Sequence, residues 1–187
     1  MFNVKKFIGK SYDIQSEMEQ RGVADLIEGK IARHIITNHN GTKATSLRSI
    51  EDVKVGEHIW IDTKTLDINK QFHMPNMISI ERLKKLYDDK QNELIYIFVK
   101  YSKGNGKVNI VDVEVLKIED ISWDSLQVSN LGNGQVQIKN ANNKTKKFIG
   151  TRAEWLNILK QKVISFIDKQ IEKRIKQKIV WEQFNEE

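Results

Sequence analysis

Two stretches in the first half of the chain carry apolar residues at the spacing of an amphipathic helix. Between about Ser16 and Thr37, the stripe consists of Val23, Ile27, Ile31 and Ile35. A shorter stripe between Ile78 and Tyr87 consists of Ile80, Leu83 and Tyr87. Because side chains three or four residues apart share one face of a helix, each pattern predicts a helix that packs against a core.

The C-terminal region predicts a long helix. Thr151 is followed three residues later by Glu154, the signature of a capping box at a helix N-terminus. The apolar stripe that follows, up to about Phe184, consists of Ile158, Phe166, Ile171, Ile175 and Ile179. This pattern suits an amphipathic helix packed on the domain. The helix is longer than one small domain needs, so pairing with a second subunit also fits.

Two stretches predict neighbouring strands at the centre of a sheet. The run 94–101, LIYIFVKY, is continuously apolar, β-branched and aromatic, as in a strand that is buried on both faces. The run 108–118 alternates and suits an antiparallel partner. The expected fold class is therefore α/β (α+β), with a central mixed or antiparallel sheet flanked by helices. No repeat or linker divides residues 1–187, so the sequence predicts a single domain.

The segment from Ser49 to Thr65, SIEDVKVGEHIWIDTKT, separates its apolar and polar residues as a β-hairpin would. If residues 56–58 form the loop, Val55 lies opposite Ile59 and Val53 lies opposite Ile61. These side chains share one face, because side chains alternate along a strand. The pattern predicts that this face packs toward a core.

The opposite face of this hairpin carries Asp52, Asp62 and Lys64. The predicted register places the two aspartates across from one another. Two carboxylates at such a distance repel one another unless a cation lies between them, and their oxygen atoms suit Mg²⁺. A lysine beside them can stabilise charge on a phosphate or position the attacking water. The pattern predicts a metal-dependent nuclease site, although an Asp-x-Lys sequence on a strand is commonly only a solvated polar face.

Composition narrows the function further. The chain has a formal net charge of +6 and a pI near 9.3, which favours an anionic partner such as nucleic acid. The absence of cysteine excludes disulfides, thiolate metal sites and a cysteine nucleophile. No signal-peptide pattern or apolar run of membrane-span length occurs, so we expect a cytoplasmic protein without a membrane segment. The sequence contains no Gly-x-Ser-x-Gly elbow, His-Glu-x-x-His motif or Walker-type phosphate loop.

Several polar residues are candidates for DNA contact. After a turn at 131–134, Gln135, Gln137 and Lys139 alternate onto one strand face, and glutamine can form two hydrogen bonds with adenine. Asn76 lies in the irregular stretch expected after the Asp62 strand. A basic cluster suited to phosphate contacts consists of Lys144, Lys146 and Lys147. An ordinary polar hairpin face, a turn asparagine and a solvated charge run explain these residues equally well.

In Asp52, Asp62 and Lys64, the chain resembles the type II restriction endonucleases of the PD-(D/E)xK superfamily. The order is Asp, a spacer, Asp or Glu, any residue, and Lys, and Glu51 stands where the superfamily name has proline. Residues 61–83 and 123–140 resemble blocks shared by a subset of these enzymes. The resemblance covers most of the chain and implies a restriction-endonuclease-like core.

The resemblance also implies roles for individual residues. Asp52, Asp62 and the Thr63 carbonyl would hold Mg²⁺, and Lys64 would orient or activate the attacking water. Hydrolysis would leave a 5′-phosphate and a 3′-hydroxyl. Glu28 is the best match to a glutamate that family members often contribute from the first helix, although a solvated helix glutamate is an equally good interpretation.

The function expected from these observations is that of a Mg²⁺-dependent type II restriction endonuclease. It would cleave double-stranded DNA at a short palindrome as a homodimer, since two-fold symmetric DNA calls for a two-fold symmetric protein. Two alternatives fit the sequence as well. One is a structure-selective repair or junction-resolving nuclease with the same metal site, and the other is a non-catalytic DNA-binding module.

Overall fold

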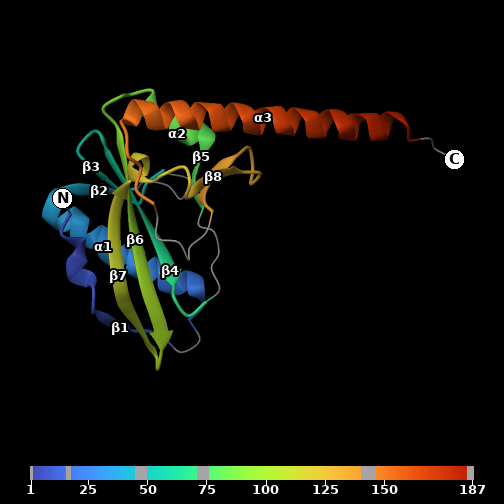
Figure 1. The fold of residues 1–187 in the computed structure, drawn as a ribbon. Coiled ribbons are helices and arrows are strands. Elements are labelled where there is room, and N and C mark those ends of the chain that lie inside the picture. Colours follow the sequence, from blue (N-terminus) through green and yellow to red (C-terminus); the bar gives the residue numbers. More distant parts are fainter. Residues whose placement is uncertain (1, 16–17, 45–49, 71–75, 140–145, 185–187) are drawn as a thin grey trace.

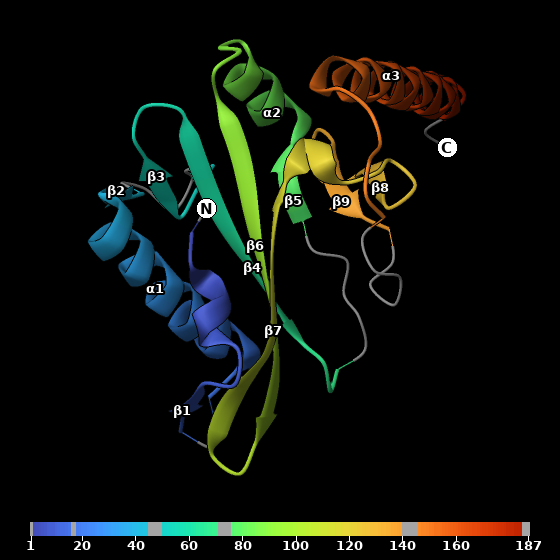
Figure 2. The ribbon, with the colours of Figure 1, turned by 60° about the vertical axis from the view of Figure 1, so that its left-hand side comes forward.

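A six-stranded mixed sheet forms the centre of the computed structural model, which describes residues 2–15, 18–44, 50–70, 76–139 and 146–184 (Figures 1 and 2). The strand order is β1-β7-β6-β4-β3-β2. The strands are β1 (Ser11–Asp13), β2 (Gly41–Lys43), β3 (Val53–Val55), β4 (Ile59–Asp67), β6 (Glu93–Gly104) and β7 (Lys107–Lys117). Strands β4 and β6 run parallel, and the other neighbours are antiparallel.

The predicted central strand and its antiparallel partner are confirmed as β6 and β7. The chain turns between them at Asn105 and Gly106, where φ is 52° and 67°. Asn-Gly is favoured in two-residue hairpin turns because both positions need a positive φ. Strand β6 extends beyond the predicted run 94–101, through Ser102 and Lys103 to Gly104.

Helix α1 (Gln20–His39) covers one face of the central sheet (Figure 2). It begins later than the expected Ser16, and Asn40 ends it in a left-handed conformation with φ 51°. The helix packs with the short helix η1 (Val4–Phe7) and with alternate residues of the strands. The predicted apolar stripe is confirmed, because four of its members are completely buried: Val23, Ile27, Ile31 and Ile35.

The other face of the central sheet is covered by a small antiparallel sheet and by helices. The covering elements are β5 (Asn76–Ser79), β8 (Leu126–Ser129), β9 (Gln135–Ile138), α2 (Ile80–Tyr87), η2 (Ile118–Asp120) and α3 (Arg152–Glu182). Their apolar side chains surround Leu94 and Tyr96 of β6, and the rings of Trp123 and Trp155 pack 4.9 Å apart. Two separate cores therefore lie on the two faces of the central sheet.

The segment between β4 and α2 differs from the prediction. We expected an irregular stretch from Leu66 to Met77, but β4 continues to Asp67, and Asn76 begins strand β5 rather than lying in a loop. Helix α2 begins at Ile80, because the Ser79 side chain caps it. A four-residue strand with an irregular register offers too few alternating positions to be recognised from sequence.

Helix α3 is 31 residues long and begins with the predicted capping box between Thr151 and Glu154. Its first half packs on the small sheet, but every residue from Ile171 to Phe184 is exposed. Figure 1 shows this second half projecting beyond the rest of the protein. The interpretation of a helix packed on the domain is thus correct only for the first half. Within the described ranges, no helix is long and apolar enough to cross a membrane.

Candidate active site

The hairpin that carries the two aspartates has the predicted register. Val53 pairs with Ile61 and Val55 pairs with Ile59. Ile61 is completely buried against the α1 layer, as expected for the apolar face. The amide of Asp52 donates to the Ile61 carbonyl at 2.8 Å, which continues the ladder one step beyond β3. This step brings Asp52 alongside β4 at the level of the second aspartate.

The backbone of β4 orients the first carboxylate. The Thr63 amide donates a hydrogen bond to Oδ2 of Asp52 at 2.7 Å. Thr63 itself is only 3% exposed, so this donor has a fixed position. The sequence did not predict this role of Thr63. Its carbonyl as a metal ligand stays a prediction.

Asp62 and Lys64 form an ion pair on the same face of β4, with 2.6 Å between Nζ of Lys64 and Oδ2 of Asp62. The Asp62 residue is 7% exposed, and burial raises its pKa to about 7. The Lys64 ammonium opposes this rise, whereas the Asp52 carboxylate adds to it. The contact with Lys64 therefore does not fully compensate the buried negative charge.

Helix α1 brings Glu28 into the electrostatic neighbourhood of this pair. Burial is the main cause that raises the pKa of Glu28 to about 7, and the next cause is the Asp52 carboxylate. Lys64 lowers this pKa, and Asp62 raises it. Glu28 is half-buried, and the charges of both predicted metal ligands act on it, but its role in the site stays a prediction.

Sequence reasoning missed two residues beside the site. Glu51 adds to the rise in the Asp62 pKa, and its Oε2 atom is buried without a hydrogen-bond partner among the described residues. Tyr96 lies next to Asp62 in the parallel register between β4 and β6. It is completely buried, its hydroxyl likewise has no partner within the described part, and burial raises its pKa well above the usual value.

Only Glu51 left a signal in the sequence, through its place directly before Asp52. Nothing near Tyr96 along the chain points to the site. Its position depends on the pairing of β4 with β6, which the sequence does not specify.

The donor atoms are suited to a hard divalent cation. Over the described ranges, no three histidine, aspartate or glutamate side chains are arranged to hold an ion by themselves. Asp52, Asp62 and the Thr63 carbonyl would leave the remaining coordination positions to water, which is the usual pattern for protein-bound Mg²⁺. Burial is the main cause of the raised pKa of Asp62 and the Asp52 carboxylate adds to it, so a bound cation would stabilise the buried negative charge.

The structure places the residues predicted to read bases within the small sheet. Asn76 of β5 pairs with Gln137 of β9, and the Gln137 side-chain amide donates to Oδ1 of Asn76. Gln137 is buried, and Gln135 is half-buried on the same strand. Contact of Gln137 with a base would therefore require exchange of its hydrogen bond with Asn76.

The lysines predicted to contact DNA are exposed where the structure describes them. Lys139 is exposed, and its Nζ donates to the Trp123 carbonyl at 3.1 Å. Lys146 and Lys147 are also exposed, and Nζ of Lys146 lies 3.6 Å from a carboxylate oxygen of Asp124. Lys144 lies outside the described residues.

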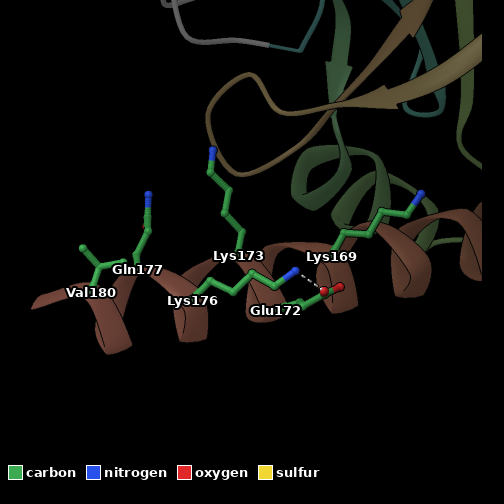
Figure 3. Close-up of a pocket in the computed structure, with 6 residues that line it drawn as sticks. All are labelled: Lys169, Glu172, Lys173, Lys176, Gln177 and Val180. Carbon is green, nitrogen blue, oxygen red and sulfur yellow. Dashed lines mark hydrogen bonds and ion pairs between the residues drawn. The ribbon is translucent and has the colours of Figure 1, made fainter. Parts of the chain in front are cut away.

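A basic groove of about 620 Å³ separates the β8–β9 hairpin from α3. Its lysines are Lys139, Lys162, Lys169 and Lys173. A second hollow of about 390 Å³ follows the projecting half of α3, with Lys169, Lys173 and Lys176 among its lining residues (Figure 3). Neither hollow includes the carboxylate pair. The sequence did not indicate the groove, because its lysines come from segments that are distant along the chain.

Comparison with known proteins gives a likeness in fold. No family model and no curated protein matches the sequence. Among solved structures, the NlaIV restriction endonuclease matches with a TM-score of 0.58 and 11% sequence identity, over 86% of this chain and 75% of that chain. At this identity the match shows a shared fold. It confirms the restriction-endonuclease-like core that the sequence led us to expect.

Proposed function

We propose that this protein is a Mg²⁺-dependent type II restriction endonuclease. It would hydrolyse double-stranded DNA at a short palindrome, as a homodimer with one active site for each strand. One observation carries the proposal: on a restriction-endonuclease-like fold, Asp52 is held against the Thr63 amide beside the buried pair of Asp62 and Lys64.

The chemistry follows from the charges at the site. Asp52, Asp62 and the Thr63 carbonyl would hold Mg²⁺, which would act as a Lewis acid toward the scissile phosphate. Lys64 lies within 2.6 Å of Asp62, so its ammonium would be close enough to position the attacking water and to stabilise negative charge on the phosphate. Water attacks phosphorus, the bond to O3′ breaks, and the products carry a 5′-phosphate and a 3′-hydroxyl.

Glu28 is suited to receive the proton of the attacking water. A general base works best when its pKa lies near the working pH, and the Glu28 pKa is raised to about 7. The helix that carries Glu28 is anchored by buried isoleucines, which supports a fixed position for its backbone beside the site.

The basic groove supports a DNA substrate. Its four lysines would contact phosphates, together with Lys146 and Lys147 and, outside the described part, Lys144. Asn76, Gln135 and Gln137 would supply base contacts once the bond between Asn76 and Gln137 is exchanged for bonds to a base. Phosphate contacts position the protein, whereas base contacts decide the recognition sequence.

The test is to incubate the purified protein with long unmethylated phage DNA, with Mg²⁺ and separately with EDTA. Discrete fragments that require Mg²⁺ are expected, and sequencing their ends would give the site. A smear, or preferred cleavage of branched over linear DNA, would replace the proposal with a structure-selective or non-specific nuclease. Intact DNA that shifts on a gel in both conditions would instead identify a binding module.

A matched pair of variants tests the site assignment. Asp62→Asn removes the charge with almost no change in volume, and we expect no detectable cleavage. Asp67→Asn is the control, because Asp67 is also a buried aspartate of β4 but lies outside the site. An asparagine there can still accept the hydrogen bond from the Asn69 amide. Cleavage by a folded Asp62→Asn variant at the wild-type rate would contradict the assignment.

A further inference from the structure

Helix α3 carries two apolar faces rather than one stripe. Trp155, Leu159 and Phe166 lie on one face. A second set is rotated by about 160° around the helix axis, at 3.6 residues per turn. This second set, here called the isoleucine seam, consists of Ile164, Ile167, Ile171, Ile175 and Ile179. The sequence-based stripe from Ile158 to Ile179 had merged the two faces.

The first face attaches α3 to the body of the protein. Trp155 is completely buried, and its Nε1 donates to the Ile121 carbonyl at 2.9 Å. Phe166 lies over Gly134, where a Cβ would come within 2.9 Å of the ring and where φ is +106°. The attachment ends near Gln170, whose side chain donates to Asn130 at 2.8 Å. These contacts leave the isoleucine seam unused.

The isoleucine seam is open to solvent along its whole length. Its five members are 44–55% exposed. They follow one another at steps of three, four, four and four residues, so the seam extends for about 22 Å along the helix and its four-residue steps are inclined to the axis by roughly 26°. A contiguous apolar surface of this kind marks an interaction site, whereas scattered exposed apolar residues do not.

The spacing of the seam fits a second helix. β-Branched side chains at steps of three and four residues are the core residues of paired helices. The mean step is 15/4, or 3.75 residues, which is longer than the 3.6 residues of one turn and is typical of helices that pair with a right-handed twist. The occupant of the seam should therefore be a helix of similar length.

The charges beside the seam identify this helix as a second copy in parallel orientation. Asp168 and Glu172 border one edge, and Arg174 and Lys178 border the other. In a parallel pair the acidic edge of each helix meets the basic edge of its partner. In an antiparallel pair centred on Ile171 the two acidic edges would meet. Within one helix, Glu172 pairs with Lys176 and Lys178 pairs with Glu182. Such exposed ion pairs are weak, so they can be replaced by ion pairs between the two helices.

Of the residues that line the hollow in Figure 3, Glu172 borders the seam, whereas Lys169 and Lys173 stay outside such a pair. Lys169 and Lys173 point toward the body of the protein in that view. At 3.6 residues per turn they lie on the side of the helix opposite the seam. Pairing through the seam would therefore leave the basic groove and its lysines accessible.

We infer that α3 pairs in parallel with α3 of a second copy of this chain through the isoleucine seam. This surface would be the dimer interface that the proposed function requires. The inference rests on the proposed function only for its expectation of a dimer. The parallel orientation places both nuclease bodies at the same end of the helix pair, where one DNA duplex can reach both sites.

The first test measures oligomeric state by sedimentation of the full chain, without DNA or metal. The wild type is expected to be a dimer. Ile171→Glu places a charge at the centre of the seam and should raise the dimer dissociation constant by roughly 100-fold or more. Its far-UV circular dichroism at room temperature should stay unchanged, because Ile171 is exposed and belongs to neither hydrophobic core. Ile149→Glu is the control, since Ile149 is 95% exposed and outside the seam.

A wild-type monomer, or a dimer that Ile171→Glu leaves intact, would overturn the inference. The nuclease proposal is tested separately, because Asp62→Asn should dimerise like the wild type. A wild-type monomer that cleaves DNA would overturn the inferred pairing through the seam and leave the nuclease activity standing. A dimer that neither cleaves nor needs Mg²⁺ would overturn the proposed function alone.

Cysteine crosslinking tests the orientation, because the natural chain has no cysteine. In a parallel pair Ile179→Cys lies beside its own copy, so this variant alone should form a disulfide-linked dimer under mild oxidation. In an antiparallel pair residue 179 lies opposite residue 164. Crosslinking only in a mixture of Ile164→Cys and Ile179→Cys chains would overturn the parallel arrangement.

Discussion

Ile61 and Asp62 are neighbours on β4 and nearly equally buried, yet burial has opposite energetic consequences for the two side chains. Ile61 faces the α1 layer, where apolar contacts stabilise the fold. Asp62 faces the other layer, where a carboxylate is buried beside Asp52 with a single lysine as its counterion. Burial of an apolar side chain lowers the free energy of the fold, whereas burial of an incompletely paired charge raises it. One strand therefore carries stability on one face and the proposed chemistry on the other.

The difference has a clear structural basis. Alternation along a strand lets two adjacent residues experience unrelated environments. The apolar face can therefore hold the strand rigid while the polar face retains a charge arrangement that is unfavourable without a cation. The following predictions test this separation, from the largest expected effect to the smallest.

The largest effect is expected from Lys64→Met, which keeps the length of the side chain and removes its charge. Loss of the ammonium that stabilises charge on the phosphate should lower the cleavage rate by about 10³-fold. The matched control is Lys100→Met. Lys100 of β6 forms its ion pair with Asp112 of β7, not with a residue of the site. Initial cleavage rates at saturating Mg²⁺ measure both variants. A loss of less than tenfold for Lys64→Met would remove Lys64 from the proposed chemistry.

On the apolar face, Ile61→Ala should lower the free energy of unfolding by about 2–4 kcal/mol. The substitution removes three carbon atoms from a completely buried position and leaves a cavity between α1 and the sheet. Urea denaturation measures the change. Ile149→Ala, at a position 95% exposed, should stay within about 0.5 kcal/mol of the wild type. Equal effects of the two substitutions would mean that the α1 layer is not the stabilising side.

Glu28 is the residue of the α1 layer whose charge reaches the site, so Glu28→Gln tests whether the two layers are functionally separate. We expect a loss of about tenfold to 100-fold in cleavage rate with little change in stability, because a proposed general base is removed without a change in volume. Asp25→Asn, one turn earlier on α1 and exposed, is the control. An unchanged rate for Glu28→Gln would favour the interpretation of a solvated helix glutamate.

The smallest effect concerns the pH dependence of stability without divalent cations. The folded-state pKa of Asp62 is raised from its ordinary value of 3.8 to about 7, so the folded protein holds a proton that the unfolded chain releases. The contribution of Asp62 to stability is fully present when the pH is below its ordinary pKa of 3.8, and it is lost as the pH rises toward 7. Asp62→Asn should therefore be more stable than the wild type at pH 8, by on the order of 1–2 kcal/mol.

Urea denaturation at pH 5 and pH 8 in EDTA measures this difference. At pH 5 the advantage of the variant should be smaller, because Asp62 is then largely protonated in the folded protein. Addition of Mg²⁺ at pH 8 should stabilise the wild type and not the variant. If the free energies of unfolding of the two proteins change equally between pH 5 and pH 8, Asp62 is not a source of the unfavourable charge.

Local patterns in the sequence predicted the elements whose partners lie nearby in the chain. The hairpin register of Val53 with Ile61 followed from alternation and loop length, and the buried stripe of α1 followed from its four-residue spacing. The same local reasoning identified Asp52, Asp62 and Lys64 as one face. The capping box at Thr151 was predicted for the same reason, because its two side chains are three residues apart.

Reasoning from the sequence was less successful where distant segments meet. Asn76 was assigned to a loop, although it pairs with Gln137 on β9, sixty-one residues later. Tyr96 beside Asp62 was missed because its place depends on the parallel pairing of β4 with β6. The apolar residues of α3 were merged into one stripe, since hydrophobicity alone does not distinguish a face that meets the body from a face that is left exposed.

The sequence by itself determined the helices, the central strands, the hairpin register and the excess of positive charge, because each depends on residues that are close in the chain or on composition alone. The tertiary structure decided which carboxylates are buried together, which lysines border one groove and which face of α3 remains open. These features depend on distances between segments that no local pattern encodes. Burial then sets their energies, because a charge or an isoleucine has a different free energy in solvent than against another layer.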